Sequence, residues 1–412
     1  MHSTLIDSLR DTPEGREAAD ILRKCVHCGF CNATCPTYQL LGDELDGPRG
    51  RIYLIKQIVE GRPVTEKTRL HLDRCLTCLS CETTCPSGVE YHRLLAIGRH
   101  LTEKQVPRRG GEALLRFALR EVLPRPRLFA ALAGIGRALR PVLPSLLADK
   151  LPPEVPGRSA PWPDGNASAR RMILLAGCVQ PALAPNINTA TARVLGRLGI
   201  AALQVSKAAC CGALRHHLND HDGTLDDARR NIDAWWPEIE AGIEAIIVTA
   251  SGCGVQVREY GHLLRGDPEY AGKAARVAAL TRDPAEVLVA EGARLLPLLE
   301  ARQRKRGRLA FHSSCTLQHG LKVRGVVESL LLAAGFELVN VADAHLCCGS
   351  AGTYSVLQAE LSRQLRDRKL TALTAGRPLQ IATANIGCLT HLQAGCDLPV
   401  MHWIELIDEI LK

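Results

Sequence analysis

The spacing of hydrophobic residues divides the chain near residue 170. In the N-terminal part, apolar side chains recur at helical spacing within residues 50–60, which predicts a helix there. In the C-terminal part, short apolar runs alternate with helical stretches, and this alternation is typical of a parallel α/β sheet. The elements expected in this part are strands at residues 172–176, 200–205 and 245–249 and a helix at residues 189–198.

The region between these two parts is rich in proline. Nine of the 23 prolines fall within residues 120–165, and proline interrupts helices because it lacks the backbone N–H donor. We therefore expect a connector made of short helical pieces. Within it, residues 128–147 are apolar apart from two arginines, which suits a membrane surface, a partner protein or packing against the chain's own domains.

Composition narrows the class of protein. The chain has 17 cysteines in 412 residues, and its first 20 residues lack the layout of an export signal. This combination favours a reducing compartment, where thiols serve metals or redox chemistry. No run of 18 apolar residues is present, so we expect no membrane-spanning helix. A net charge of +8 with 4% aromatic residues does not favour a nucleic-acid-binding protein, and the basic run at residues 302–308 is expected to be a solvated linker.

The N-terminal cysteines form two copies of one motif. Each copy has the pattern C-x2-C-x2-C-x3-C-P, and the second begins 50 residues after the first. Three thiolates two residues apart bind one iron–sulfur cube, while in two-cluster ferredoxins the fourth binds the other cube. Structural zinc is the alternative, although zinc ribbons use two CxxC pairs separated by a longer loop. The expected ligands of two [4Fe–4S] clusters are Cys25, Cys28, Cys31 and Cys85 for the first and Cys75, Cys78, Cys81 and Cys35 for the second.

Two arginines, Arg49 and Arg51, stand at the start of the helix expected between the two motifs. Their charge could screen the negative charge of the clusters or face a partner. They could equally belong to a solvated turn after Gly47 and Pro48. The sequence leaves these interpretations open.

The C-terminal cysteines also recur. Two single cysteines and a Cys-Cys-Gly triplet reappear displaced by 135 to 137 residues, which indicates an internal duplication. The single cysteines follow expected strand ends, and the carboxyl ends of parallel strands share one edge of a sheet. Each set should therefore converge. The two sets are Cys178, Cys210, Cys211 and Cys253, and Cys315, Cys347, Cys348 and Cys388.

Three interpretations of these two sets stay open. Soft thiolates suit a further iron–sulfur cluster in one or both repeats, but they also suit zinc or a redox-active thiol pair. Buried inert cysteines are the third interpretation. Gly212 and Gly349, which follow the paired cysteines, allow a positive φ angle or a close approach of the backbone to a bulky group. Cys396 is left over and is expected to be a core or surface thiol.

The repeat resembles the CCG cysteine-rich domain of heterodisulfide reductase catalytic subunits. Its fusion behind a dicluster ferredoxin resembles the iron–sulfur subunits of glycolate oxidase (glycolate dehydrogenase), lactate-utilisation and anaerobic glycerol-3-phosphate dehydrogenase systems. Several strings are specifically similar to the glycolate oxidase iron–sulfur subunit family, from about residue 20 to the C-terminus and most weakly over residues 105–168. These strings lie at residues 177–181, 186–188, 190–194, 230–237, 249–254, 343–354, 383–388 and 402–406.

The resemblance implies an α+β multidomain chain. We expect a helical two-[4Fe–4S] ferredoxin module at residues 1–105 and a proline-rich helical connector at residues 106–168. Two α/β CCG domains should follow at residues 169–300 and 301–412. In one respect the chain departs from heterodisulfide reductase, whose repeats end in CxxC, because Gln256 and His391 stand at those positions. Four thiolates per repeat suit a cubane cluster or an unfilled site rather than a five-thiolate cluster.

The resemblance also implies a function. No nucleophile–base pair, Walker loop or GxGxxG motif is present, and oxidation of a 2-hydroxy acid needs a two-electron cofactor such as flavin. The family places flavin on two partner flavoprotein subunits only. We therefore expect an electron-transfer subunit of glycolate oxidase that relays electrons toward quinone or another membrane acceptor, in the cytoplasm on the inner face of the membrane. Alternatives are the same relay for lactate or glycerol-3-phosphate, or a non-catalytic zinc or redox-sensing thiol protein.

Overall fold

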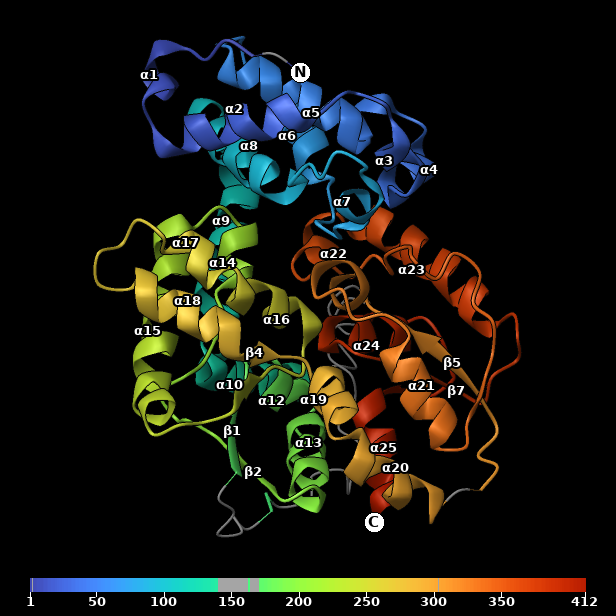
Figure 1. The fold of residues 1–412 in the computed structure, drawn as a ribbon. Coiled ribbons are helices and arrows are strands. Elements are labelled where there is room, and N and C mark those ends of the chain that lie inside the picture. The colour runs from blue at the N-terminus through green and yellow to red at the C-terminus, as the bar shows by residue number, and fades with distance from the viewer. Residues whose placement is uncertain (2, 140–161, 164–169, 303) are drawn as a thin grey trace. The chain divides into compact units, whose positions relative to one another are not determined.

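The structure is a computed structural model that describes residues 1, 3–139, 162–163, 170–302 and 304–412 (Figure 1). The chain forms two compact units, the first made of residues 1–117 and 345–369 and the second of residues 118–344 and 370–412. Of the expected connector at residues 106–168, the structure describes residues 106–139 and 162–163, which include two helices. The C-terminal part of the apolar segment at residues 128–147 lies outside the described residues, and its N-terminal part is helical.

The first unit is helical in the part of the chain that is described. Prolines occupy the first turn of several of its helices, where the missing N–H donor costs nothing. Its helices are α1 (Asp7–Arg10), α2 (Pro13–Lys24), α3 (Phe30–Ala33), α4 (Pro36–Leu41), η1 (Glu44–Asp46), α5 (Pro48–Val59), α6 (Glu66–Asp73), α7 (Ser80–Thr84), α8 (Tyr91–Gln105), α22 (Tyr354–Leu357) and parts of α9 (Gly110–Val122) and α23 (Ala359–Thr374).

The core of the first unit lies between α2, α5 and α8. Leu22, Ile55 and Leu94 are fully buried there. Gly98 brings α8 close to α5, because a Cβ atom at this position would lie 2.5 Å from Cγ1 of Ile55. The helix predicted at residues 50–60 is confirmed as α5. This close packing fixes the scaffold that carries the N-terminal cysteine loops.

The second unit contains two four-stranded parallel sheets. The strand orders are β2-β1-β3-β4 and β6-β5-β7-β8, so both sheets have the same topology. The predicted α/β fold and its duplication are thereby confirmed, and the three predicted strands each end two residues earlier than expected. The strands are β1 (Arg170–Leu174), β2 (Ile200–Leu203), β3 (Ala245–Ile247), β4 (Thr281–Arg282), β5 (Arg308–His312), β6 (Glu337–Leu338), β7 (Gln380–Thr383) and β8 (Val400–His402).

Helices surround both sheets of the second unit (Figure 1). The helix predicted at residues 189–198 is confirmed as α13. The helices are α10 (Pro126–Ala138), α12 (Gln180–Leu183), α13 (Asn186–Arg197), α14 (Ala213–His217), α15 (His221–Glu240), α16 (Ser251–Arg258), α17 (Tyr260–Leu263), α18 (Ala271–Leu280), α19 (Pro284–Ala290), α20 (Gly292–Glu300), the π-helix η3 (Thr316–Gly320), α21 (Val326–Ala333), α24 (Ile386–Gln393) and α25 (Trp403–Leu411).

The two repeats share one hydrophobic core. Helix α13 of the first repeat packs against α25 of the second, and the interface buries Ile187 and Ile404 completely. The Nε–H of Arg193 in α13 donates a bifurcated hydrogen bond to the two carboxylate oxygens of Asp408 in α25, at 2.9 and 3.1 Å. The repeats therefore fold as one body.

Helix α10 presents an apolar stripe to solvent. Leu128, Leu132, Ile135 and Leu139 are 39% to 57% exposed, and their spacing places them on one face of the helix. The opposite face of α10 packs on the chain itself, because Ala133 is buried and Nη2 of Arg137 donates to the carbonyl oxygen of Ala182 over 2.6 Å. No helix in the described part of the chain is long and apolar enough to cross a membrane.

The neutral form of His402 holds the start of α25. Its Nδ1 accepts a hydrogen bond of 3.3 Å from the backbone N–H of Ile404, and its Nε2 lies 3.0 Å from the carbonyl oxygen of Thr249. Burial lowers the pKa of His402 to about 4, against the opposing effect of its backbone partners. Protonation at Nδ1 would remove the acceptor that caps the helix.

We predict that His402 makes folding pH-dependent between about 6.5 and 4. The unfolded chain binds a proton below about pH 6.5 and the folded chain does not, so the free energy of unfolding falls by up to about 1.4 kcal/mol per pH unit. In urea titrations at pH 7.5 and 5.5, the stability advantage of the unchanged protein over His402→Asn should shrink by about 1.4 kcal/mol. An advantage that is equal at both pH values would contradict the prediction.

Candidate iron–sulfur centres

Both N-terminal motifs fold into the same loop. The residues on either side of the middle cysteine adopt positive φ angles in each copy: 59° at His27 and 85° at Gly29, 52° at Thr77 and 64° at Leu79. Three of these four residues are not glycine, so the conformation costs free energy. Matched strain at equivalent positions indicates a functional constraint, namely that each loop must turn its thiols inward.

Short helices complete each loop. Cys31 lies in the first turn of α3 and Cys81 in the first turn of α7, each two residues after the left-handed residue that begins its helix. Cys35 precedes the first turn of α4, where Pro36 begins the helix, and Cys85 follows the last turn of α7. The fourth cysteine of each motif is thus carried away from the first three by a change in chain direction.

Two adjoining pockets gather these eight thiols. The two pockets, A and B, adjoin, because Cys81 and Pro48 line both. In each pocket, the fourth cysteine comes from the opposite motif, which is the arrangement expected from the spacing. Pocket A is lined by Cys25, Cys28, Cys31 and Cys85, and pocket B by Cys35, Cys75, Cys78 and Cys81.

The electrostatics of these pockets favour a positively charged occupant. Burial, followed by the neighbouring thiols, raises the pKa of Cys31 to about 11. Burial also raises the pKa of Cys81 well above its usual value, with Cys78, Cys75 and Cys35 as further causes. Metal cations reverse such shifts, because they bind the thiolate and offset the repulsion between neighbouring sulfurs. The soft, convergent donor set fits an iron–sulfur cluster in each pocket.

The first cysteine-rich repeat brings its four predicted cysteines together. Cys178 follows β1, Cys210 and Cys211 precede α14, and Cys253 lies in the first turn of α16. Side-chain hydrogen bonds connect Cys178 with Cys210, Cys210 with Cys211, and Cys211 with Cys253. The neighbouring thiols raise the pKa of Cys178 and of Cys211, while those same contacts lower that of Cys210.

The paired-cysteine loops of the two repeats have the same local geometry. The N–H of Gly212 donates to Sγ of Cys210 over 3.4 Å, and the N–H of Gly349 donates to Sγ of Cys347 over 3.4 Å. Both glycines have positive φ angles, of 85° and 86°. The two repeats therefore also share the hydrogen bonds that the sulfur atoms of their paired cysteines accept.

Side chains that the sequence analysis did not identify support the first paired loop. Asn231 of α15 donates from Nδ2 to the carbonyl oxygen of Cys210 over 2.7 Å and to the hydroxyl of Tyr260 over 3.0 Å. Tyr260, fully buried, donates in turn to the carbonyl oxygen of Cys211 over 3.0 Å. These bonds fix the backbone of the loop. No pattern within the motif itself could have identified them.

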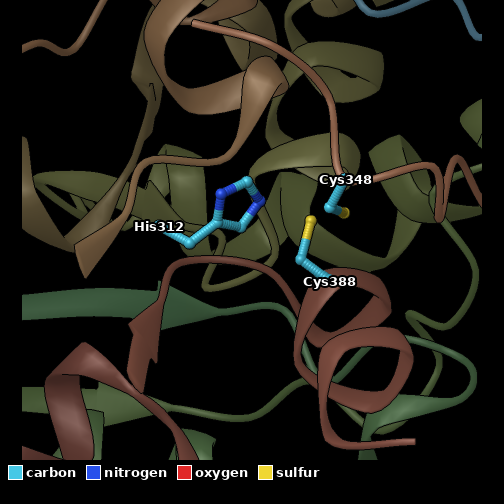
Figure 2. Close-up of side chains that lie close together, drawn as sticks. All are labelled: His312, Cys348 and Cys388. Carbon is cyan, nitrogen blue, oxygen red and sulfur yellow. The ribbon is translucent and has the colours of Figure 1, made fainter. Parts of the chain in front are cut away.

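The second repeat places a histidine beside its thiols. Cys315 comes three residues after the end of β5, and Cys388 lies in the first turn of α24. The ligand atoms of His312, the last residue of β5, and of Cys388 lie within 4.8 Å of one another, and both residues are buried. Figure 2 shows these two side chains; Cys348, also labelled there, belongs with Cys347 to the segment at residues 345–369 of the first unit.

His312 was missed by the sequence analysis. Its position three residues before Cys315, at a predicted strand end, is the signal that could have identified it. The equivalent position in the first repeat, displaced by 137 residues, is Leu175. Cys396, the leftover cysteine, donates from Sγ to the carbonyl oxygen of Leu392 over 3.4 Å and is half-buried.

The helices that carry Cys253 and Cys388 begin side by side. The hydroxyl of Ser251 at the start of α16 lies 2.7 Å from that of Thr316. The amide Nδ2 of Asn385, at the start of α24, donates to the same Ser251 hydroxyl over 3.1 Å. The strand edges that bear the single cysteines of the two repeats therefore face each other within the second unit.

The chain has a helical unit with two adjoining four-thiol pockets, followed by two parallel sheets that carry cysteines. These features define a dicluster ferredoxin fused to cysteine-rich domains. The 4Fe-4S dicluster domain family matches residues 21–89, and the cysteine-rich domain family matches residues 172–258 and 309–393. The dicluster match confirms the expected two [4Fe–4S] clusters. The chain belongs to the glycolate oxidase iron–sulfur subunit family.

Two relatives carry this assignment. The chain is 55% identical to the glycolate oxidase iron–sulfur subunit of Escherichia coli (strain K12), over 100% of both chains. It is 32% identical to a probable glycolate oxidase iron–sulfur subunit of Bacillus subtilis (strain 168), over 91% of this chain and 89% of that one. Lactate utilization protein A of Geobacillus thermodenitrificans is 30% identical over 58% of this chain and 98% of its own length.

We predict that alanine at Gly349 is more destabilising than alanine at the equivalent Gly212. Both positions require a positive φ angle, which costs about 1–2 kcal/mol for alanine. At Gly349 the new Cβ would also lie 2.5 Å from the carbonyl oxygen of Ser362, whereas at Gly212 its nearest neighbour, the carbonyl oxygen of Thr224, is 3.2 Å away. We expect losses of about 3 and about 1.5 kcal/mol in anaerobic thermal unfolding.

The matched control is Gly266→Ala, which is exposed and meets no atom within 4 Å. Its effect should stay within about 0.5 kcal/mol. Equal losses for the Gly349 and Gly212 variants would show that the close approach to Ser362 carries no cost.

Proposed function

We propose that this chain is the electron-transfer subunit of a complex that oxidises glycolate to glyoxylate. The observation that carries the proposal is the pair of adjoining four-thiol pockets in a chain that is 55% identical, from end to end, to a glycolate oxidase iron–sulfur subunit. When bound, iron–sulfur clusters exchange single electrons, and two of them side by side suit a relay. Two flavoprotein subunits would supply the oxidation of the substrate.

The proposed ligands follow from the linings of the pockets. Residues of pocket A would hold one cluster and residues of pocket B the other, so that Cys85 and Cys35 are the crossing ligands. Prolines after both crossing cysteines support this assignment, because they fix the backbone where the chain leaves each pocket. Zinc is not favoured, since two adjoining thiol pockets that share Cys81 suit a dicluster module.

We also propose a thiolate-bound metal centre in each cysteine-rich repeat. The hydrogen-bonded thiols of Cys178, Cys210, Cys211 and Cys253 support the first, which would be an iron–sulfur cluster or zinc. The second set is Cys315, Cys347, Cys348 and Cys388, and its support is its equivalence to the first. The matched contacts of Gly212 and Gly349 with their sulfur atoms strengthen that equivalence.

Helix α10 supports the proposal of a membrane-associated complex. Four exposed apolar side chains on one helix face, next to basic residues such as Arg127 and Arg137, suit an interfacial helix on an anionic membrane. A complex held on the inner face of the cell membrane would lie near its proposed quinone acceptor. Residues 140–147 of the same apolar segment lie outside the described residues.

A relay for lactate is the second candidate function. Its support is the 30% identity to a lactate utilization protein over 58% of this chain. The substrate would be chosen by the flavoprotein partner, so both candidates assign the same role to the thiols of this chain.

We predict that glycolate-dependent reduction of a quinone analogue requires this chain with its clusters. Membranes with both flavoprotein subunits should lose this activity when the chain is deleted and regain it with the unchanged chain. Cys85→Ser should not restore it, because pocket A loses its crossing ligand. Cys396→Ser, which alters the leftover thiol, is the matched control and should restore it.

Parallel assays with lactate and glycerol-3-phosphate decide between the candidates. Preference for lactate would favour the second candidate. Full glycolate activity without the chain, or with a chain that contains zinc and no iron, would refute the relay.

We predict that the apolar face of α10 binds membranes. Leu132→Glu combined with Ile135→Glu removes two side chains whose burial contributes about 1.5 kcal/mol each or more, so the membrane partition coefficient should fall about a hundredfold or further. The measurement is co-sedimentation of the purified chain with vesicles of phosphatidylethanolamine and phosphatidylglycerol. Leu379→Glu, at a residue that is 64% exposed outside α10, is the control. Equal binding of all three proteins would remove the membrane role.

A further inference from the structure

Helix α5 points one arginine toward each of the two thiol pockets. Arg49 lines pocket A and Arg51 lines pocket B, while Pro48 lines both. The two arginines are two residues apart, so their side chains leave the helix in different directions. Each lining therefore includes one arginine, and what differs between these two arginines is their environment.

Arg49 is held in partial contact with solvent. Its side chain is 36% exposed, and its Nε donates to Oε1 of Glu44 over 2.6 Å while Nη2 donates to Oε2 over 3.1 Å. Glu44 is itself 42% exposed. A charge that is paired with a carboxylate and screened by water contributes little to the potential inside the neighbouring pocket.

Arg51 is 1% exposed, which excludes the interpretation of this residue as part of a solvated turn. Its Nε donates to the carbonyl oxygen of His71 over 2.7 Å, and its Nη1 and Nη2 each donate to Oγ1 of Thr37 over 3.2 Å. The same Thr37 hydroxyl lies 3.3 Å from Sγ of Cys35. One hydroxyl thus connects the guanidinium to a proposed cluster ligand.

The charge of Arg51 is only partly compensated. Its nearest carboxylate is that of the fully buried Asp46, at 3.5 Å from Nη2. Asp46 has a closer cation, since Arg74 donates to it from Nη1 over 2.7 Å, and His71 approaches it at 3.1 Å. Two arginines therefore share one carboxylate, which leaves an excess positive charge at the wall of pocket B. Because this charge is shielded from water, it acts strongly on its surroundings.

Pocket B also has a neighbour from the cysteine-rich part of the chain. Tyr354, in α22 of the first unit, interacts electrostatically with Arg51, Cys75 and Cys347, and burial is the main cause that raises its pKa. The segment that bears a proposed ligand of the second repeat thus approaches pocket B. Tyr354 lines neither pocket itself.

We propose that Arg51 makes the cluster of pocket B the one with the higher reduction potential. Reduction adds a negative charge to a cluster, and a buried cation stabilises that state more than a solvated, paired cation does. Arg51 is thus a positioning residue that favours the electron in pocket B, beside the segment of Cys347. This inference rests on the proposed assignment of one cluster to each pocket.

The test is an anaerobic potentiometric titration of the full-length protein, followed by electron paramagnetic resonance. Arg51→Gln should lower the potential of one cluster by about 59 mV or more, a tenfold change for a one-electron couple. The affected cluster should be the one that changes when Cys78 is replaced by Ser. Arg49→Gln is the matched control and should leave that cluster's potential unchanged.

The substitution Asp46→Asn should shift the reduction potential in the opposite direction. It removes the shared carboxylate and leaves Arg51 in place, so the potential of the same cluster should rise. Arg51→Lys keeps the charge and should retain most of the potential even if Arg51→Gln does not fold. A purely structural role would not give shifts of opposite sign.

Two results separate failure of this inference from failure of the proposed function. Eight irons per chain with potentials that do not respond to Arg51→Gln, Arg51→Lys or Asp46→Asn would overturn the role of Arg51 alone. Fewer than eight irons in the anaerobically prepared, unchanged protein would overturn the assignment of the two pockets and this inference with it.

Discussion

Burial of many thiolates is the constraint on which this structure depends. Desolvation and mutual repulsion oppose ionisation of the sulfurs in both N-terminal pockets, as the raised pKa values of Cys31 and Cys81 express. Only a metal, with help from nearby cations, can hold such a set together. In the proposed ligand assignment, the crossing of Cys35 and Cys85, the strained turns at Thr77 and Leu79 and the compact α5–α8 scaffold would bring the donors to that metal. Folding and cluster binding are thus coupled.

The duplicated part of the chain keeps its backbone and varies its side chains. Both sheets have the same strand order, and both paired-cysteine loops direct a glycine N–H at a sulfur over 3.4 Å. Around this shared frame the neighbours differ, with Leu175 in one repeat where His312 stands in the other. The two repeats therefore offer different chemical environments on equivalent backbones, which suits centres with different properties.

The sequence was most informative where spacing alone determines geometry. The three-residue spacer before Cys35 and before Cys85, and the proline after each, predicted that these two cysteines would leave their own loops. Apolar runs ending in Gly-Cys predicted the edges of β1 and β3. Burial of Arg51 could not be predicted, because it depends on Thr37 and His71, which lie 14 and 20 residues away in the sequence. His312 could be singled out only by its position three residues before Cys315, since its proximity to Cys388 arises from the pairing of β5 with β7.

One difference between the two N-terminal loops has a chemical consequence. Cys28 is exposed, whereas its counterpart Cys78 is 9% exposed. Dioxygen, peroxide and chelators reach metal centres through the accessible ligand, so damage to this protein should start in pocket A. Handling in air would then produce a half-loaded population in which the remaining iron belongs to the protected loop.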